Sequence, residues 1–131
     1  MNEKKILIFE DEWTTIRGSF ELANIFAFEG QLRFIQKARS QDVVFTSWRD
    51  CYDAVFIDIT LAKNTVWDGF NIIQQIKAQD IIDLNKVVIL TGNSKVEEKL
   101  QEMGFDTNVV NVLYKPVAFN VLAELLKKIL G

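Results

Sequence analysis

The stretch Ala54-Val55-Phe56-Ile57-Asp58 places an acid directly after four apolar residues. A strand that helices cover on both faces is a continuous apolar run, without the alternation of a half-exposed strand. Open α/β sheets bind their ligands at the carboxyl ends of such strands. We therefore expect Asp58 to lie at the functional edge of a parallel sheet.

Three other apolar runs also end in polar side chains. Residues 6–9 lead into Glu10 and Asp11, residues 87–90 into Thr91, and residues 109–114 into Lys115. The carboxyl ends of parallel strands share one edge of a sheet, so these side chains are expected near one another.

The segments between these runs predict the rest of the fold. Residues 32–36 complete a set of five strands, and helices are expected over residues 13–28, 40–49, 70–78, 95–103 and 117–130. The helix over 40–49 rests on Val44 and Trp48, which would form its inner face. The order βα, repeated five times, predicts an α/β protein of flavodoxin-like (βα)5 fold, with a five-stranded parallel sheet and helices on both faces. We expect one domain over residues 1–131.

The composition excludes several kinds of protein. The sequence has no histidine and one cysteine, which excludes Ser-His-Asp catalysis, phosphohistidine carriers, histidine metal sites and zinc clusters. A net charge of −3 without a basic cluster gives no reason to expect nucleic acid as a partner. No apolar stretch reaches the roughly 18 residues of a membrane span. With the lone Cys51, this favours a cytoplasmic protein without membrane contact.

Five motifs together resemble the receiver domain of bacterial two-component response regulators, over essentially the whole chain. They are Phe9-Glu10-Asp11-Glu12, Phe56-Ile57-Asp58, Asp68-Gly69, Leu90-Thr91-Gly92 and Tyr114-Lys115-Pro116. Each motif is weak alone, but all five in this order are hard to obtain by chance.

The resemblance implies a phosphoacceptor in two-component signalling or a phosphorelay. Asp58 would accept a phosphoryl group from a partner sensor histidine kinase or histidine phosphotransfer protein. Thr91 and Lys115 would contact the phosphoryl oxygens, and the Lys115–Pro116 bond would be cis. The implied Mg²⁺ ligands are Glu10, Asp11, Asp58 and the backbone carbonyl of Thr60. Such a domain is a signalling switch rather than an enzyme, although it assists its own phosphorylation and its own hydrolysis.

Charge balance supports these roles independently. A carboxylate that attacks phosphorus approaches a group of like charge, so cations must neutralise the site. One Mg²⁺ and one lysine cancel the charge of three carboxylates, and Mg²⁺ prefers hard oxygen ligands. Alone, each feature has a plainer explanation. The acids at 10–12 could be a solvated helix start, Thr91 a strand-end residue, and Lys115 a surface lysine.

The sequence also departs from the family pattern. Glu10 stands where aspartate is more usual, and the loop from Asp58 to Gly69 is about three residues longer than typical. The family's switch aromatic lies three residues before the lysine, where this chain has Val112. Tyr114 is aromatic, but strand alternation would point it away from Lys115.

Two other functions fit parts of the pattern. The first is a receiver-like protein-interaction module that phosphorylation does not switch, which Val112 and the altered loop favour. The second is a haloacid-dehalogenase-type phosphatase. Such enzymes place a second acid two residues after the nucleophile, where this chain has Thr60.

The end of the sequence bears on the output. It stops one residue after the last predicted helix, so we expect a stand-alone domain that signals by contact or relays the phosphoryl group. On that helix Leu122, Leu126 and Ile129 should face the sheet. Phe119, Val121 and Leu125 would lie off this stripe. Helix 95–103, strand 109–114 and helix 117–130 would then form a surface for an output partner or a homodimer, unless Phe119 merely seals the loop above its helix.

Overall fold

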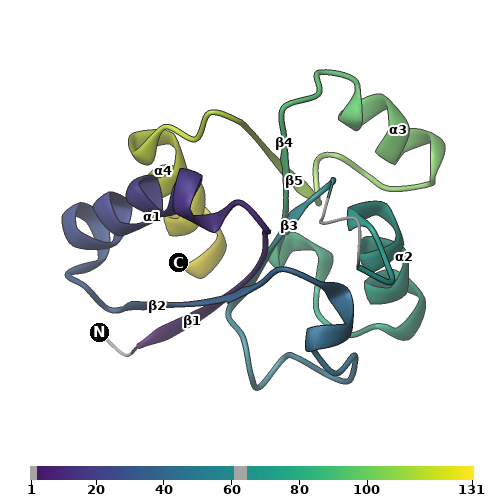
Figure 1. The fold of residues 1–131 in the computed structure, drawn as a ribbon, viewed down its shortest axis with the longest axis horizontal. Helices are drawn as coiled ribbons and strands as arrows, with labels where there is room; N and C mark the ends of the chain where they lie inside the picture. Colours follow the sequence, from purple (N-terminus) through teal and green to yellow (C-terminus); the bar gives the residue numbers. More distant parts are fainter. Residues whose placement is uncertain (1–2, 61–64) are drawn as a thin grey trace.

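The computed structural model describes residues 3–60 and 65–131. Five strands form one parallel sheet in the order β2-β1-β3-β4-β5 (Figure 1). They are β1 (Lys4–Phe9), β2 (Leu32–Lys37), β3 (Ala54–Asp58), β4 (Val87–Thr91) and β5 (Asn111–Tyr114). The chain first builds to one side of β1 and then crosses to the other side, so a topological switch point lies between β1 and β3. The predicted flavodoxin-like fold is confirmed.

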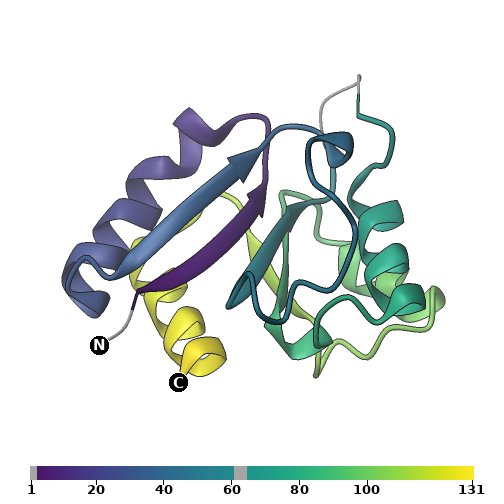
Figure 2. The same cartoon turned by 90° about the horizontal axis from the view of Figure 1, so that it is seen from below.

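Helices cover both faces of this sheet. The described residues form four α-helices: α1 (Trp13–Phe28), α2 (Gly69–Gln79), α3 (Val96–Glu102) and α4 (Phe119–Leu130). Helices α1 and α4 lie side by side on one face, and α2 and α3 cover the other (Figures 1 and 2). None of the helices in the described ranges is long and apolar enough to cross a membrane.

The central strands are buried along their whole length. Every residue of β3 and β4 is buried, as their unbroken apolar runs predict. Val55 and Ile57 pack into the core under α2 and α3, whereas Phe56 packs into the core under α1 and α4. Each fully buried aliphatic or phenylalanine side chain contributes about 1.5–3 kcal/mol of transfer free energy. These two cores fix the strand ends that carry the polar residues.

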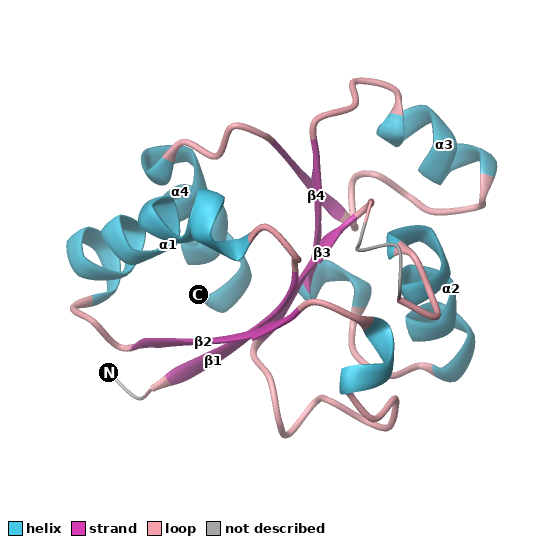
Figure 3. Ribbon diagram, viewed as in Figure 1, coloured by secondary structure: helices cyan, strands magenta, loops and turns pink. Residues whose placement is uncertain are grey.

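The helix predicted over residues 40–49 is wrong. Only one 3-10 turn, η1 (Ser40–Asp42), forms there, and the rest of the β2–β3 connection is loop (Figure 3). Val44 is 77% exposed rather than inward-facing, while Trp48 is 2% exposed. The run from 43 to 46 is β-branched or aromatic at every position, and such residues are poor helix formers.

An aromatic cluster covers the sheet where that helix was expected. The indole of Trp48 packs against the rings of Phe9, Phe45 and Tyr52, with centroids 5.0–6.1 Å apart. Its Nε1 donates to the carbonyl of Val44 at 3.0 Å. The cluster therefore supplies the buried apolar area that a fifth helix would have given.

The loop after Asp58 returns to the sheet at Gly69. Residues 61–64 of this long loop lie outside the described residues. Asp68 caps α2 by accepting a hydrogen bond from the backbone N of Asn71 at 2.8 Å. A Cβ at Gly69 would come within 2.5 Å of the Asp58 carbonyl oxygen. A residue without a side chain is therefore required where α2 begins.

Candidate functional site

Two acids follow β1 and a third ends β3, and the sheet brings them together. β1 and β3 are adjacent and parallel, with Phe9 opposite Ile57. The next residues of both strands therefore emerge at the same edge. Carboxylate oxygens of Glu10, Asp11 and Asp58 all lie within 4.8 Å of one another. The cluster sits at the switch point, where open α/β sheets bind ligands.

The two oxygens of Asp58 have different environments. Oδ1 accepts a hydrogen bond from the backbone N of Thr60 at 3.1 Å, and the Thr60 hydroxyl lies 3.4 Å from the same oxygen. Oδ2 faces Lys115, whose Nζ is 3.5 Å away. One oxygen is thus held by the backbone while the other is turned towards a cation.

Glu10 is fully buried and more strongly bonded than Asp58. Its Oε2 pairs with Nζ of Lys115 at 2.8 Å, and its Oε1 accepts from the backbone N of Glu12 at 3.0 Å. Its own backbone is fixed by β2, because the carbonyl accepts from the Gln36 side chain at 2.6 Å. The longer side chain of glutamate therefore reaches the lysine at the far side of the site.

Thr91 and Lys115 come from the two strands on the other side of β3. Thr91 ends β4 one residue beyond Leu90, which lies opposite Asp58. Its buried hydroxyl accepts from the backbone N of Asn93 at 2.9 Å. Lys115 follows β5, with its backbone N bonded to the Thr91 carbonyl at 2.7 Å. The Lys115–Pro116 peptide bond is cis.

Burial and like charge govern the electrostatics of the site. Burial raises the pKa of Glu10, with the charge of Asp58 adding to it, and Lys115 opposes both. Burial likewise raises the pKa of Asp58, against the hydrogen bond from Thr60 and the charge of Lys115. Burial lowers the pKa of Lys115, but its contacts with the two carboxylates outweigh this and leave the pKa raised. The site therefore carries acids that are costly to ionise and a lysine that stays charged.

The donor set fits a hard divalent cation. Three carboxylates can each offer one oxygen within a space of 4.8 Å, and only one of the three, Asp11, is exposed. Mg²⁺ binds oxygen ligands and keeps several waters, which an open side at Asp11 allows. Such an ion would also stabilise the charged forms of Glu10 and Asp58, which burial disfavours.

The structure brings the residues predicted for the site to one edge of the sheet. Two residues of β5 outside this set, Val112 and Tyr114, were also singled out in the sequence. Val112 packs against the core under α2 and α3. Tyr114 is 40% exposed, and burial together with the carboxylate of Glu97 on α3 raises the pKa of Tyr114.

One expectation for α4 was wrong. Leu125, expected off the inner stripe, is half-buried against the core. Phe119 lies off the buried stripe as expected, at 38% exposure, and packs on Phe26 of α1 with ring centroids 5.9 Å apart. Its contact with α1 could not be predicted from helical spacing within α4. Leu122, Leu126 and Ile129 are buried as predicted.

Gln36 was missed by the sequence analysis. It lies near the end of β2 and holds the Glu10 carbonyl at 2.6 Å. The signal available in the sequence was a polar side chain late in a strand. The structure places this residue opposite Ile8 of β1.

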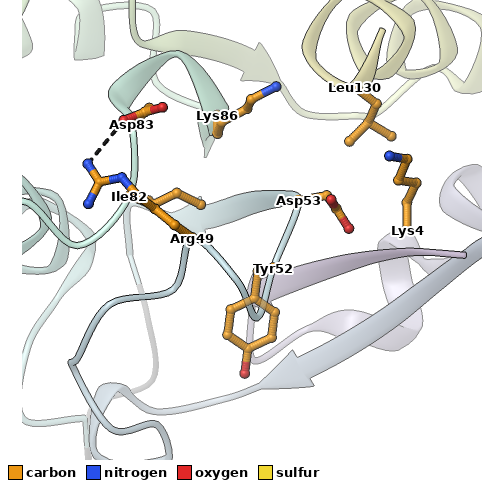
Figure 4. A pocket seen from close by; sticks show the side chains of 8 residues that line it. All are labelled: Lys4, Arg49, Tyr52, Asp53, Ile82, Asp83, Lys86 and Leu130. Atoms are coloured by element: carbon orange, nitrogen blue, oxygen red, sulfur yellow. Dashed lines mark hydrogen bonds and ion pairs between the residues drawn. The ribbon is translucent and has the colours of Figure 1, made fainter.

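A pocket of about 220 Å³ lies at the opposite end of the sheet (Figure 4). Four of its charged side chains, those of Arg49, Asp53, Asp83 and Lys86, are engaged with protein partners. Arg49 pairs with Asp80 and Asp83 at 2.7 and 3.0 Å. Asp53 accepts from the backbone N of Lys5 at 2.9 Å, and Lys86 donates to the Ile129 carbonyl. The contacts indicate that these four charged residues of the pocket stabilise the fold.

Comparison with known proteins supports the fold assignment. No protein-family model and no curated protein matches the sequence. Among solved structures, the receiver domain of a sensor histidine kinase from Pseudomonas aeruginosa PAO1 has a TM-score of 0.70 and 23% identity, covering 98% of both chains. The chain has the receiver-domain fold.

Two further receiver domains show the same likeness. A Francisella response regulator receiver domain has a TM-score of 0.67 at 17% identity, over 98% of this chain and 97% of that one. The NtrX receiver domain of Brucella abortus has a TM-score of 0.65 at 20% identity, over 95% and 97%. The Pseudomonas structure contains a magnesium ion coordinated in its active site cleft. The receiver-domain fold thus extends over nearly the whole chain.

Burial of the Asp58 carboxylate predicts that Asp58→Asn stabilises the metal-free protein. At neutral pH the free energy of unfolding should rise by about 1 kcal/mol, because a charged group that is costly to bury is removed. A carboxylate whose pKa is raised by folding costs nothing below its unfolded pKa, and the cost appears as pH rises through its folded pKa. The stabilisation should therefore vanish near pH 4. Denaturant unfolding from pH 4 to 8 measures it, and a variant less stable than wild type at neutral pH would contradict this account.

Proposed function

We propose that the protein is a phosphoacceptor domain of a two-component or phosphorelay pathway. It would take a phosphoryl group onto Asp58 from the phosphohistidine of a partner sensor histidine kinase or histidine phosphotransfer protein. The observation that carries the proposal is the meeting of Glu10, Asp11, Asp58 and Lys115 at the switch point of a receiver-domain sheet.

In this proposal Glu10, Asp11, Asp58 and the carbonyl of Thr60 hold Mg²⁺, which supplies charge neutralisation when bound. The Thr60 backbone N holds Oδ1 of Asp58 and keeps the carboxylate oriented. Lys115, already 3.5 Å from Oδ2, adds the second positive charge.

The proposed transfer forms an O–P bond and breaks a P–N bond. A carboxylate oxygen of Asp58 attacks phosphorus, and the electron pair of the P–N bond leaves with the partner's imidazole. The hydroxyl of Thr91 and the ammonium of Lys115 contact the transferred oxygens. Attack of water on phosphorus would later return the carboxylate and release phosphate. The same groups would assist both steps.

The phosphatase alternative lacks its general acid. The residue two beyond Asp58 is Thr60, whose hydroxyl lies 3.4 Å from Oδ1 and cannot supply the proton that a second carboxylic acid would. The other alternative is an interaction module that phosphate does not switch, which Val112 in the core favours. An interaction module of this kind can be told apart by experiment, because its Asp58 would stay unmodified.

Phosphorylation by a small phosphodonor tests the proposal. With acetyl phosphate and Mg²⁺, intact mass should show one added phosphoryl group on wild type and none on Asp58→Asn. The matched control is Asp53→Asn, which changes an acid next to the other end of β3. Chelation of Mg²⁺ should lower wild-type labelling by at least about 100-fold, because electrostatic stabilisation supplies most of this catalysis. Labelling of Asp58→Asn at the wild-type rate would remove Asp58 from its role.

We also propose that the output partner or a second copy binds the surface of α3, β5 and α4. Tyr114 at 40% exposure and Val121 at 51% support this surface, while Phe119 packs on Phe26 of α1 and Leu125 is half-buried against the core. The proposal places the domain in the cytoplasm, beside its phosphodonors, and without nucleic acid or membrane as a partner.

Val121→Glu tests the surface. We expect self-association or partner binding to weaken about tenfold, since a charge replaces an exposed apolar contact, with acetyl phosphate labelling unchanged. Sedimentation of the phosphorylated protein measures self-association. The control is Val44→Glu, a valine on the β2–β3 connection that is still more exposed, at 77% against 51% for Val121. Equal effects of the two substitutions would place the surface elsewhere.

A further inference from the structure

Two departures from the expected pattern meet in space. The first is the β2–β3 connection, which has the η1 turn in place of a helix, and the second is the long loop after Asp58. Ser40 of η1 is 1% exposed. Its hydroxyl accepts from the backbone N of Trp67 at 2.9 Å, and its backbone N donates to the Thr65 hydroxyl at 2.8 Å. The two segments are therefore joined by reciprocal hydrogen bonds.

Three consecutive loop residues take part in this junction. The Thr65 hydroxyl donates to the Trp67 carbonyl at 2.9 Å, and the backbone N of Val66 donates to Oε1 of Gln41 at 2.9 Å. The Trp67 ring packs edge-on against Phe45 at 4.8 Å. We call this junction the clasp; it comprises Ser40, Gln41, Thr65, Val66 and Trp67. Nothing else in the described part of the loop is tied to η1 so closely.

The clasp ends two residues before Gly69, which lies against the backbone of Asp58. Trp67 is followed by the cap of α2 and then by Gly69, whose backbone N donates to the Ile59 carbonyl at 3.3 Å. The Gly69 Cα abuts Asp58 and Ile59 so closely that a Cβ would lie 2.5 Å from both backbones. Any shift of Trp67 is therefore transmitted to the chain that carries Asp58.

The orientation of Asp58 depends on this same backbone. Its Oδ1 is held by the backbone N of Thr60, the residue that follows Ile59. Displacement of Ile59 would turn that N–H away from Oδ1. A misplacement of about 1 Å in a reacting group can cost on the order of 100-fold in rate.

We propose that Ser40 and Thr65 are positioning residues for phosphoryl transfer to Asp58. Their hydroxyls hold Trp67, which keeps Gly69 against the Asp58–Ile59 backbone and so fixes the attacking carboxylate. The inference rests on the proposed function, because it names what positions the acceptor in that reaction.

A purely structural role for these hydroxyls would lower stability without altering the site. Buried polar groups need partners wherever they occur. The test therefore needs a readout other than stability, and a control variant that loses side-chain hydrogen bonds far from the site. Asn24→Ala is that control, because Asn24 makes two side-chain hydrogen bonds to the backbone of Leu32.

The experiment compares Thr65→Ala, Thr65→Ser and Asn24→Ala with wild type. The first readout is the labelling rate with acetyl phosphate at saturating Mg²⁺. The second is hydrogen exchange of the Gly69 amide, with the Asp53 amide, bonded to Lys5 at the other end of β3, as internal control. Exchange needs no phosphoryl transfer, so it reports on the clasp independently.

We expect Thr65→Ala to slow labelling about tenfold and to speed Gly69 exchange about tenfold, with Asp53 exchange unchanged. Thr65→Ser keeps the hydroxyl and should restore both values. Asn24→Ala should lower the melting temperature but label at the wild-type rate. Ser40→Ala should act in the same direction as Thr65→Ala.

Two results would overturn the proposal. One is unchanged Gly69 exchange in Thr65→Ala, which would show that the clasp does not hold Gly69. The other is faster exchange with labelling at the wild-type rate, which would show that the held backbone does not position Asp58. A wild type that is never labelled would instead overturn the proposed function, and Gly69 exchange would then still show whether the clasp holds this backbone.

Discussion

The pairing of Lys115 with two buried carboxylates is the contact on which the rest of the structure depends. Glu10 and Asp58 are both withdrawn from water, and both lie close to the ammonium of Lys115, at 2.8 and 3.5 Å. An unpaired buried charge is strongly destabilising, so the strands must deliver the lysine to the acids. That requirement ties together the ends of β1, β3 and β5.

The same charges explain why the site is suited to a cation and an anionic group together. Even with Lys115 in place the cluster keeps excess negative charge, and burial raises the pKa of Glu10 and Asp58. A divalent cation relieves this cost, and a transferred phosphoryl group then meets a neutralised surface. The same buried carboxylates are therefore costly to ionise without a cation and suited to phosphoryl transfer with one.

Much of the fold could be predicted because it rests on unbroken apolar runs. The runs ending at Asp58 and Thr91 are buried at every position, which is why both residues lie where the sequence placed them. The failures concern features that local pattern does not encode. Trp48 was assigned to a helix because of its spacing from Val44, but ring packing with Phe45 decided its position. The contact of Phe119 with Phe26 likewise needs two helices that are distant in sequence.

The support for the site could not have been predicted at all. Ser40 and Thr65 are 25 residues apart, and hydroxyl residues are common in loops. Only the fold places them together. The positions of Glu10, Asp58 and Lys115, by contrast, follow from strand order alone.

The identity of the modified residue tests the central claim most directly. Borohydride reduces an acyl phosphate to an alcohol, so protein treated with acetyl phosphate and Mg²⁺ and then reduced should contain homoserine in place of aspartate. Peptide mass spectrometry should find homoserine at position 58 and aspartate unchanged at position 11, with no reduction of Glu10 to its own alcohol. Conversion at Asp11, or a modified protein whose Asp58 peptide is unchanged, would contradict the assignment of Asp58 as the phosphoacceptor.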